Sequence, residues 1–158
     1  MDKALAERLF GTDAAIGVTF EIEGEPDPIS ACEFDRRYGA LPHREMPDAV
    51  SVLPSGGSAV CCTEYAHHIK RVLEPLGHTV AVVGFANEDN PKSRCAIVEY
   101  HPCGHDFAIV DERFLIDPWV RLVAAVEDQI FYDLHNPVDM QKALVVYGPR
   151  ECWKSLLQ

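Results

Sequence analysis

The stretch GGSAVCCTEYAHHIKRVLEPLGH, residues 56–78, contains the pattern on which the predicted fold depends. From Tyr65 onward its apolar residues recur at spacings of three and four, which is typical of a helix with one buried face. Pro75 and Gly77 then provide the usual signals that end a helix. The spacing therefore predicts a helix that runs through about Leu73 and packs one face on the rest of the chain.

The adjacent cysteines before this helix are expected to differ in role. Cys62 precedes Tyr65, Ala66 and Ile69 by three, four and seven residues, so it shares their buried face. Cys61 is rotated away from that face by about 100°. A thiol in the first turn lies at the positive end of the helix dipole, which favours the thiolate. Cys62 is therefore a candidate nucleophile, although a lone cysteine is more often an inert core residue.

The remaining patterns predict an α+β fold in a single domain covering residues 1–158. We expect a short amphipathic helix in MDKALAERLF, a half-buried strand at 16–22, and irregular structure with one short helix over 24–57. Runs rich in β-branched and aromatic residues then predict strands at 78–85, 95–100, 105–110 and 113–117. A helix near 121–134, a strand at 143–147 and a short terminal helix complete the expected order. Helices followed by an antiparallel meander indicate a helix packed on a sheet.

The overall charge excludes some partner classes. The 158-residue chain has a formal net charge of −11, which opposes binding to nucleic acid or to an anionic membrane surface. No apolar run approaches the ~18 residues that span a bilayer. With no secretory signal pattern, we expect the six cysteines to be reduced and the protein to be cytoplasmic. Export as an effector without a cleaved signal stays open.

Two downstream residues could serve a thiol nucleophile as base and orienting acid. His105 begins the predicted strand HDFAIV, and Asp117 ends the predicted strand RFLID. If the connecting loop has three residues, Asp117 lies opposite Phe107 and diagonal to His105 on the same face, within side-chain reach. An even loop would turn Asp117 to the other face. A Cys62–His105–Asp117 triad therefore requires an odd loop or a bulge in this hairpin.

The order of these residues resembles the transglutaminase-like branch of the papain-like Cys-His-Asp superfamily. The similarity rests on CTEYAHHIKRVLEPLGHTVAVVGF and HDFAIVDERFLIDPW, and covers about residues 56–120. The chain is also similar to small bacterial effectors, including glutamine deamidases, and less closely to arylamine N-acetyltransferases, whose Arg-Gly-Gly-x-Cys spacing is not kept. This resemblance implies a papain-like core with Cys62 as nucleophile, His105 as base and Asp117 as orienting acid.

The implied activity is acyl transfer from an amide through a thioester, as in a deamidase, a peptidase or a transglutaminase. The expected substrate is a protein or peptide, and no cofactor is expected. The backbone N–H of Cys62 would bind the oxyanion, with a second donor among residues 56–59.

Two alternatives stay open. The first is a non-catalytic protein-binding domain on the same scaffold, which a buried Cys62 without a nearby imidazole would favour. The second is a metal-binding protein, because HPCGH brings His101, Cys103 and His105 close together in the sequence.

Overall fold

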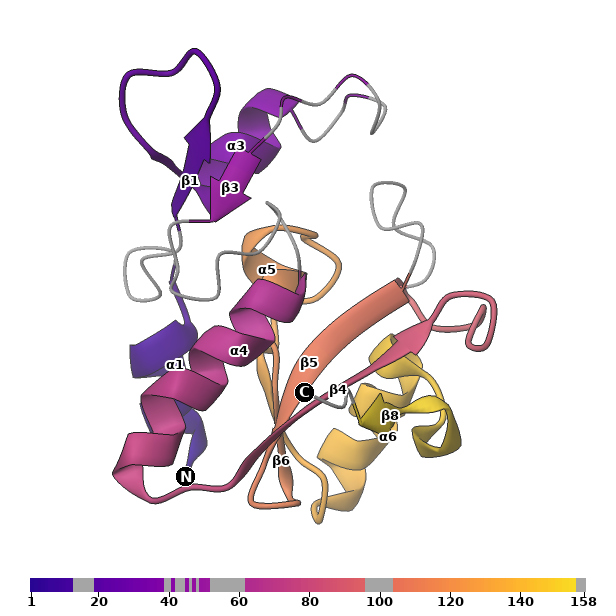
Figure 1. Cartoon of the computed structure of the whole chain (residues 1–158). Helices are drawn as coiled ribbons and strands as arrows, with labels where there is room; N and C mark the ends of the chain where they lie inside the picture. Colours follow the sequence, from indigo (N-terminus) through magenta and orange to yellow (C-terminus); the bar gives the residue numbers. More distant parts are fainter. Residues whose placement is uncertain are drawn as a thin grey trace.

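The computed structural model describes residues 1–12, 19–38, 41, 45, 47, 49–51, 62–95 and 104–155. These residues form a mixed fold of helices and antiparallel sheets (Figure 1). The predicted α+β class is confirmed. The papain-like core and the single-domain organisation stay predictions.

The larger sheet has five strands in the order β7-β6-β5-β4-β8, and each neighbouring pair is antiparallel. Strands β4, β5 and β6 match the predicted strands at 78–85, 105–110 and 113–117 and lie side by side as antiparallel neighbours, whereas β7 was not predicted. The strand bounds are Val80–Ala86 for β4, Gly104–Val110 for β5, Phe114–Ile116 for β6, Phe131–Asp133 for β7 and Lys154–Ser155 for β8.

Helices cover both faces of this sheet (Figure 1). α4 (Cys62–Leu73) packs on β4 and β5, and α1 (Lys3–Phe10) lies next to it, with the ring of Phe10 at 6.2 Å from that of His68. α6 (Pro137–Tyr147) lies on the opposite face, where the Tyr147 ring is 4.8 Å from that of Phe107. The sheet is therefore the middle layer between α4 and α6.

The predicted helix after the cysteines is confirmed. α4 buries Tyr65, Ala66, Ile69 and Leu73 of the expected apolar stripe, whereas Val72 is half-buried and Leu76, beyond the helix, is exposed. It continues into one 3-10 turn, η2 (Glu74–Leu76), and Gly77 then adopts a left-handed φ of 90° and donates its N–H to the carbonyl of Glu74. A glycine takes this conformation without steric cost, which explains why the helix stops here.

The smaller sheet lies apart from the larger one, at the end where α4 begins (Figure 1). Its order is β2-β1-β3, with β1 at Thr19–Ile22, β2 at Ile29–Ser30, β3 at Ala49–Ser51 and α3 (Ala31–Tyr38) leading out of β2. The short helix expected in 24–57 is therefore present, whereas β2 and β3 were not predicted.

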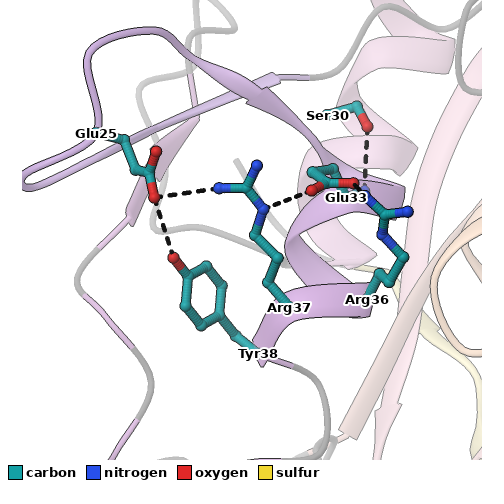
Figure 2. Close-up of polar contacts among 6 residues, drawn as sticks. All are labelled: Glu25, Ser30, Glu33, Arg36, Arg37 and Tyr38. Atoms are coloured by element: carbon teal, nitrogen blue, oxygen red, sulfur yellow. Dashed lines mark hydrogen bonds and ion pairs between the residues drawn. The ribbon is translucent and has the colours of Figure 1, made fainter.

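Contacts between α3 and the chain after β1 are partly polar. Figure 2 shows the Arg37 guanidinium between Glu33, one turn earlier, and Glu25, which also accepts from the Tyr38 hydroxyl. Exposed ion pairs of this kind contribute little to stability. The buried rings of Phe20 and Phe34, 5.8 Å apart, supply the apolar contact that holds α3 on β1.

The expectation of a strand at 143–147 is wrong, because these residues end α6. The side chain of Asn136 caps the helix by accepting from the N–H groups of Val138 and Asp139, and Pro137 occupies the first turn. These start signals, together with burial of one helical face, outweigh the β propensity of the sequence ALVVY.

The expected helix near 121–134 is also wrong for most of its length. α5 (Trp119–Leu122) is a single turn, and Phe131–Asp133 forms the edge strand β7. The last described residues form a 3-10 turn, η4 (Arg150–Cys152), and β8, where a short terminal helix was expected. The predicted strand at 95–100 lies outside the described residues apart from Cys95, as do Cys61 and the first part of the predicted strand at 16–22.

The β5–β6 hairpin has the odd-numbered loop that the predicted triad requires. Val110 pairs with Phe114, so the loop has the three residues Asp111 to Arg113. Asp111 and Glu112 adopt left-handed φ angles of 52° and 55° without a glycine. Continuing the register from Ala108↔Ile116 places residue 117 opposite Phe107, on the face of His105.

Because the exposed Glu112 is held in a left-handed conformation, Glu112→Gly should relieve strain and raise the free energy of unfolding by about 1 kcal/mol. Denaturant unfolding monitored by circular dichroism measures the change. Glu112→Val is the matched control and should destabilise, because a β-branched residue tolerates positive φ poorly. Equal stability of the two variants would contradict the left-handed turn.

Candidate active site

A buried polar contact joins His105 to Asp117. Nε2 of His105 lies 2.6 Å from Oδ2 of Asp117, and the residues are 0% and 1% exposed. The other carboxylate oxygen of Asp117 accepts the N–H of Trp119 at 3.1 Å, at the start of α5. Two adjacent strands and the turn that follows them thus hold the predicted base and orienting acid together.

Aromatic rings enclose the imidazole. The ring of His105 lies 5.0 Å from that of Trp119, 5.9 Å from that of Tyr147, 6.0 Å from that of Phe107 and 6.2 Å from that of Phe85. Such packing excludes water and fixes the ring plane. The interior therefore holds the imidazole in one orientation toward the carboxylate.

The electrostatics of the pair favour the imidazolium. Burial by itself lowers the pKa of His105, but the carboxylate of Asp117 and the neighbouring thiol group of Cys95 raise this pKa to about 10. His105 is consequently protonated at neutral pH, between a carboxylate and a cysteine sulfur. Sequence reasoning did not single out Cys95, which lies ten residues before His105 without a helix or a motif around it.

Tyr147 and Tyr132 are further groups of this site that sequence reasoning missed. Burial raises the pKa of the Tyr147 hydroxyl well above its usual value, and the nearby carboxylate of Asp117 adds to this effect. Burial likewise raises the pKa of Tyr132, with smaller contributions from Asp117 and Cys95. Both phenols are therefore neutral beside the pair. Tyr147 was hidden from sequence reasoning because its segment was expected to be a strand.

Cys62 occupies the expected place on its helix but lies on the other face of β5. Its side chain is 3% exposed, and Sγ accepts the backbone N–H of Asp106 at 3.1 Å. The prediction that Cys62 points toward the sheet is confirmed. Because successive strand residues point to opposite faces, the side chain of His105 leaves β5 on the side away from α4. The structure therefore brings His105 and Asp117 together and holds Cys62 across the strand from them.

Other features expected at the site lie beyond the described residues. These include His101 and Cys103 of the metal alternative and the glycine-rich stretch 56–59 expected to supply an oxyanion donor. Among the residues that the structure does describe, no cluster of three or more His, Cys, Asp or Glu side chains could hold a metal ion. No helix within this part of the chain is long and apolar enough to cross a membrane.

Comparison with known proteins returned no matching family model, no matching curated protein and no matching solved structure.

The raised pKa of His105 predicts a loss of stability at alkaline pH. A histidine whose pKa rises from 6.5 to about 10 on folding contributes stability that is complete below 6.5 and is lost as the pH approaches 10. The free energy of unfolding should therefore fall between pH 7 and 10. Asp117→Asn should flatten this dependence and cost about 3–5 kcal/mol at pH 7, because it leaves a buried imidazolium without its counter-ion.

The exposed pair of His78 and Asp111, with Nδ1 and Oδ2 at 2.7 Å, supplies the matched control. Asp111→Asn should have a small effect at both pH values, since a solvated pair contributes little. Denaturant titrations of the three proteins at pH 7 and pH 10 make the comparison. Parallel pH profiles for the wild type and Asp117→Asn would contradict the assigned protonation.

Proposed function

We propose that the protein is a cysteine-dependent enzyme that transfers the acyl group of an amide, as a protein glutamine deamidase or a peptidase does. The buried contact between His105 and Asp117 is the observation that carries the proposal. A carboxylate that orients an imidazole beside a thiol is the arrangement that activates cysteine nucleophiles.

The arrangement of the elements supports the same proposal. A helix that starts with Cys62 packs on an antiparallel sheet, His105 lies on its second strand, and Asp117 follows the next strand. This order is the one expected for a papain-like, transglutaminase-like core. The sequence predicts Cys62 as the nucleophile. Because Cys62 lies on the opposite face of β5 from His105, the identity of the nucleophilic cysteine is a separate question.

The proposed chemistry uses groups that the chain itself supplies. A thiolate adds to the amide carbonyl carbon, and the His105 imidazolium donates its proton to the departing nitrogen as the C–N bond breaks. Water then attacks the thioester, with neutral His105 accepting its proton, and the thiolate leaves. Asp117 keeps the imidazole in the required tautomer throughout. We place this activity in the cytoplasm, where cysteines outside disulfides, such as Cys62, Cys95 and Cys152, stay reduced.

A second candidate function is a non-catalytic protein-binding domain on the same scaffold. The burial of Cys62, His105 and Asp117 favours it, because a substrate must reach a nucleophile and its base. In this case the His105–Asp117 pair would act only as a structural contact.

The two functions differ in their reaction with p-nitrophenyl acetate, a small activated acyl donor. The enzyme should acetylate a cysteine at the site with release of p-nitrophenolate, and His105→Gln should slow this step by about 10²–10⁴-fold because the imidazolium that stabilises the attacking thiolate is lost. Absorbance measures the release, and peptide mass mapping locates the acetyl group.

Cys152→Ser is the control, since Cys152 is partly exposed and contacts the backbone of Asp89, away from His105. This variant should retain the acetylation rate. Equal rates in the wild type and a folded His105→Gln protein, or acetylation confined to Cys152, would reject catalysis in favour of the binding domain.

A further inference from the structure

The two faces of β5 separate the thiol expected from the sequence from its expected base. Asp106 points toward α4, where its carboxylate contacts the Thr63 hydroxyl. Its pairing partner on β4 is Gly84, and a Cβ there would lie 2.0 Å from Oδ1 of Asp106, so only glycine leaves room for this carboxylate. His105 points the opposite way, toward Tyr147 of α6. Cys62, whose Sγ contacts the N–H of Asp106, thus belongs to the α4 side.

Cys95 lies on the other side, where His105 is. The Ser93 hydroxyl donates to the carbonyl of Val146 at 2.6 Å and accepts the N–H of Cys95 at 3.1 Å. The side chain of Asn90 donates to the carbonyl of Tyr147 at 2.8 Å. These bonds anchor the segment containing Cys95 against the last turn of α6, whose Tyr147 ring packs on the imidazole.

Cys95 interacts with the groups around this pocket. It contributes to the raised pKa values of His105, Tyr132 and Tyr147. These three side chains come from β5, β7 and α6, and the hydrogen bonds of Ser93 and Asn90 to α6 place the segment of Cys95 on the same side of the sheet. The groups that face His105 are thus the Asp117 carboxylate, the Cys95 sulfur and two phenols.

We propose that Cys95, rather than Cys62, is the thiol on which the His105–Asp117 pair acts. The inference rests on the proposed acyl-transfer function and specifies which sulfur carries the acyl group. In the resting pair the proton is already on His105, and the Cys95 thiolate adds its Sγ to the amide carbonyl carbon. The imidazolium proton leaves with the amine, and hydrolysis of the thioester by water restores Cys95.

Complete burial of both partners determines how the proposal is tested. Cys95 and His105 are 0% exposed, so a substrate reaches them only after their enclosing side chains separate. Alkylation of the native protein would report this opening as well as the state of the thiol. Titration of the imidazole reports the pair directly, because protons exchange without entry of a substrate.

The experiment compares the His105 titration in the wild type, Cys95→Ser and Cys62→Ser by NMR of the histidine ring protons, assigned with His105→Gln. Loss of the sulfur that favours the imidazolium should lower the pKa of His105 by about 1–3 units in Cys95→Ser. Cys62→Ser is the matched control and should leave this pKa unchanged. A shift in Cys95→Ser no larger than that in Cys62→Ser would overturn the proposal.

Two further readouts apply if Cys95→Ser does not fold. Thiolate absorbance at neutral pH should be lower in His105→Gln than in the wild type, and equal absorbance would count against the pair. Peptide mapping after reaction with p-nitrophenyl acetate distinguishes the proposed acyl-transfer function from the assignment of Cys95 as its nucleophile. Acetyl on Cys95 supports both, acetyl on Cys62 supports the proposed function and overturns this inference, and acetyl on neither residue overturns both.

Discussion

The odd length of the turn between β5 and β6 is the constraint on which the polar interior depends. With three residues in the loop, Asp117 and His105 share a face of the sheet, and their side chains meet at 2.6 Å. One residue more or fewer would turn Asp117 to the α4 side and leave a buried imidazole without its counter-ion. The chain reaches this register with two left-handed residues, Asp111 and Glu112. Local strain in an exposed turn thus supports a charged contact in the core.

Burial strengthens the electrostatic contact between His105 and Asp117. In water a histidine next to an aspartate contributes little, as the solvated pair of His78 and Asp111 illustrates. The same two groups enclosed by aromatic rings interact at a lower effective dielectric, and the imidazole remains protonated far above its usual range. A protonated imidazole beside a cysteine sulfur can stabilise a thiolate, which links the packing of the core to the proposed chemistry.

Sequence patterns predicted most of the elements that surround the site. The helical stripe after Cys62, its stop at Gly77 and the strands around His105 were all recognised, because each has a strong period or an end signal. The patterns were misleading at the C-terminal end. There, ALVVY has the composition of a strand but is helical, since the cap at Asn136 and packing on the sheet outweigh intrinsic propensity. This error concealed Tyr147 and the surface on which the segment of Cys95 is anchored.

Local sequence patterns are sufficient to predict the α+β class, the antiparallel strands around His105 and the need for an odd loop if His105 and Asp117 are to meet. These follow from periodicity and from the alternation of side chains along a strand, which are local properties of the chain. The side of β5 on which each cysteine lies depends instead on long-range packing. Helical phase directs Cys62 toward the sheet but cannot say from which side of β5 the histidine leaves. The segment of Cys95 is held on the side of α6 by hydrogen bonds from Asn90 to Tyr147 and from Ser93 to Val146. These partners are far apart in the sequence, and no periodic pattern indicates that they meet.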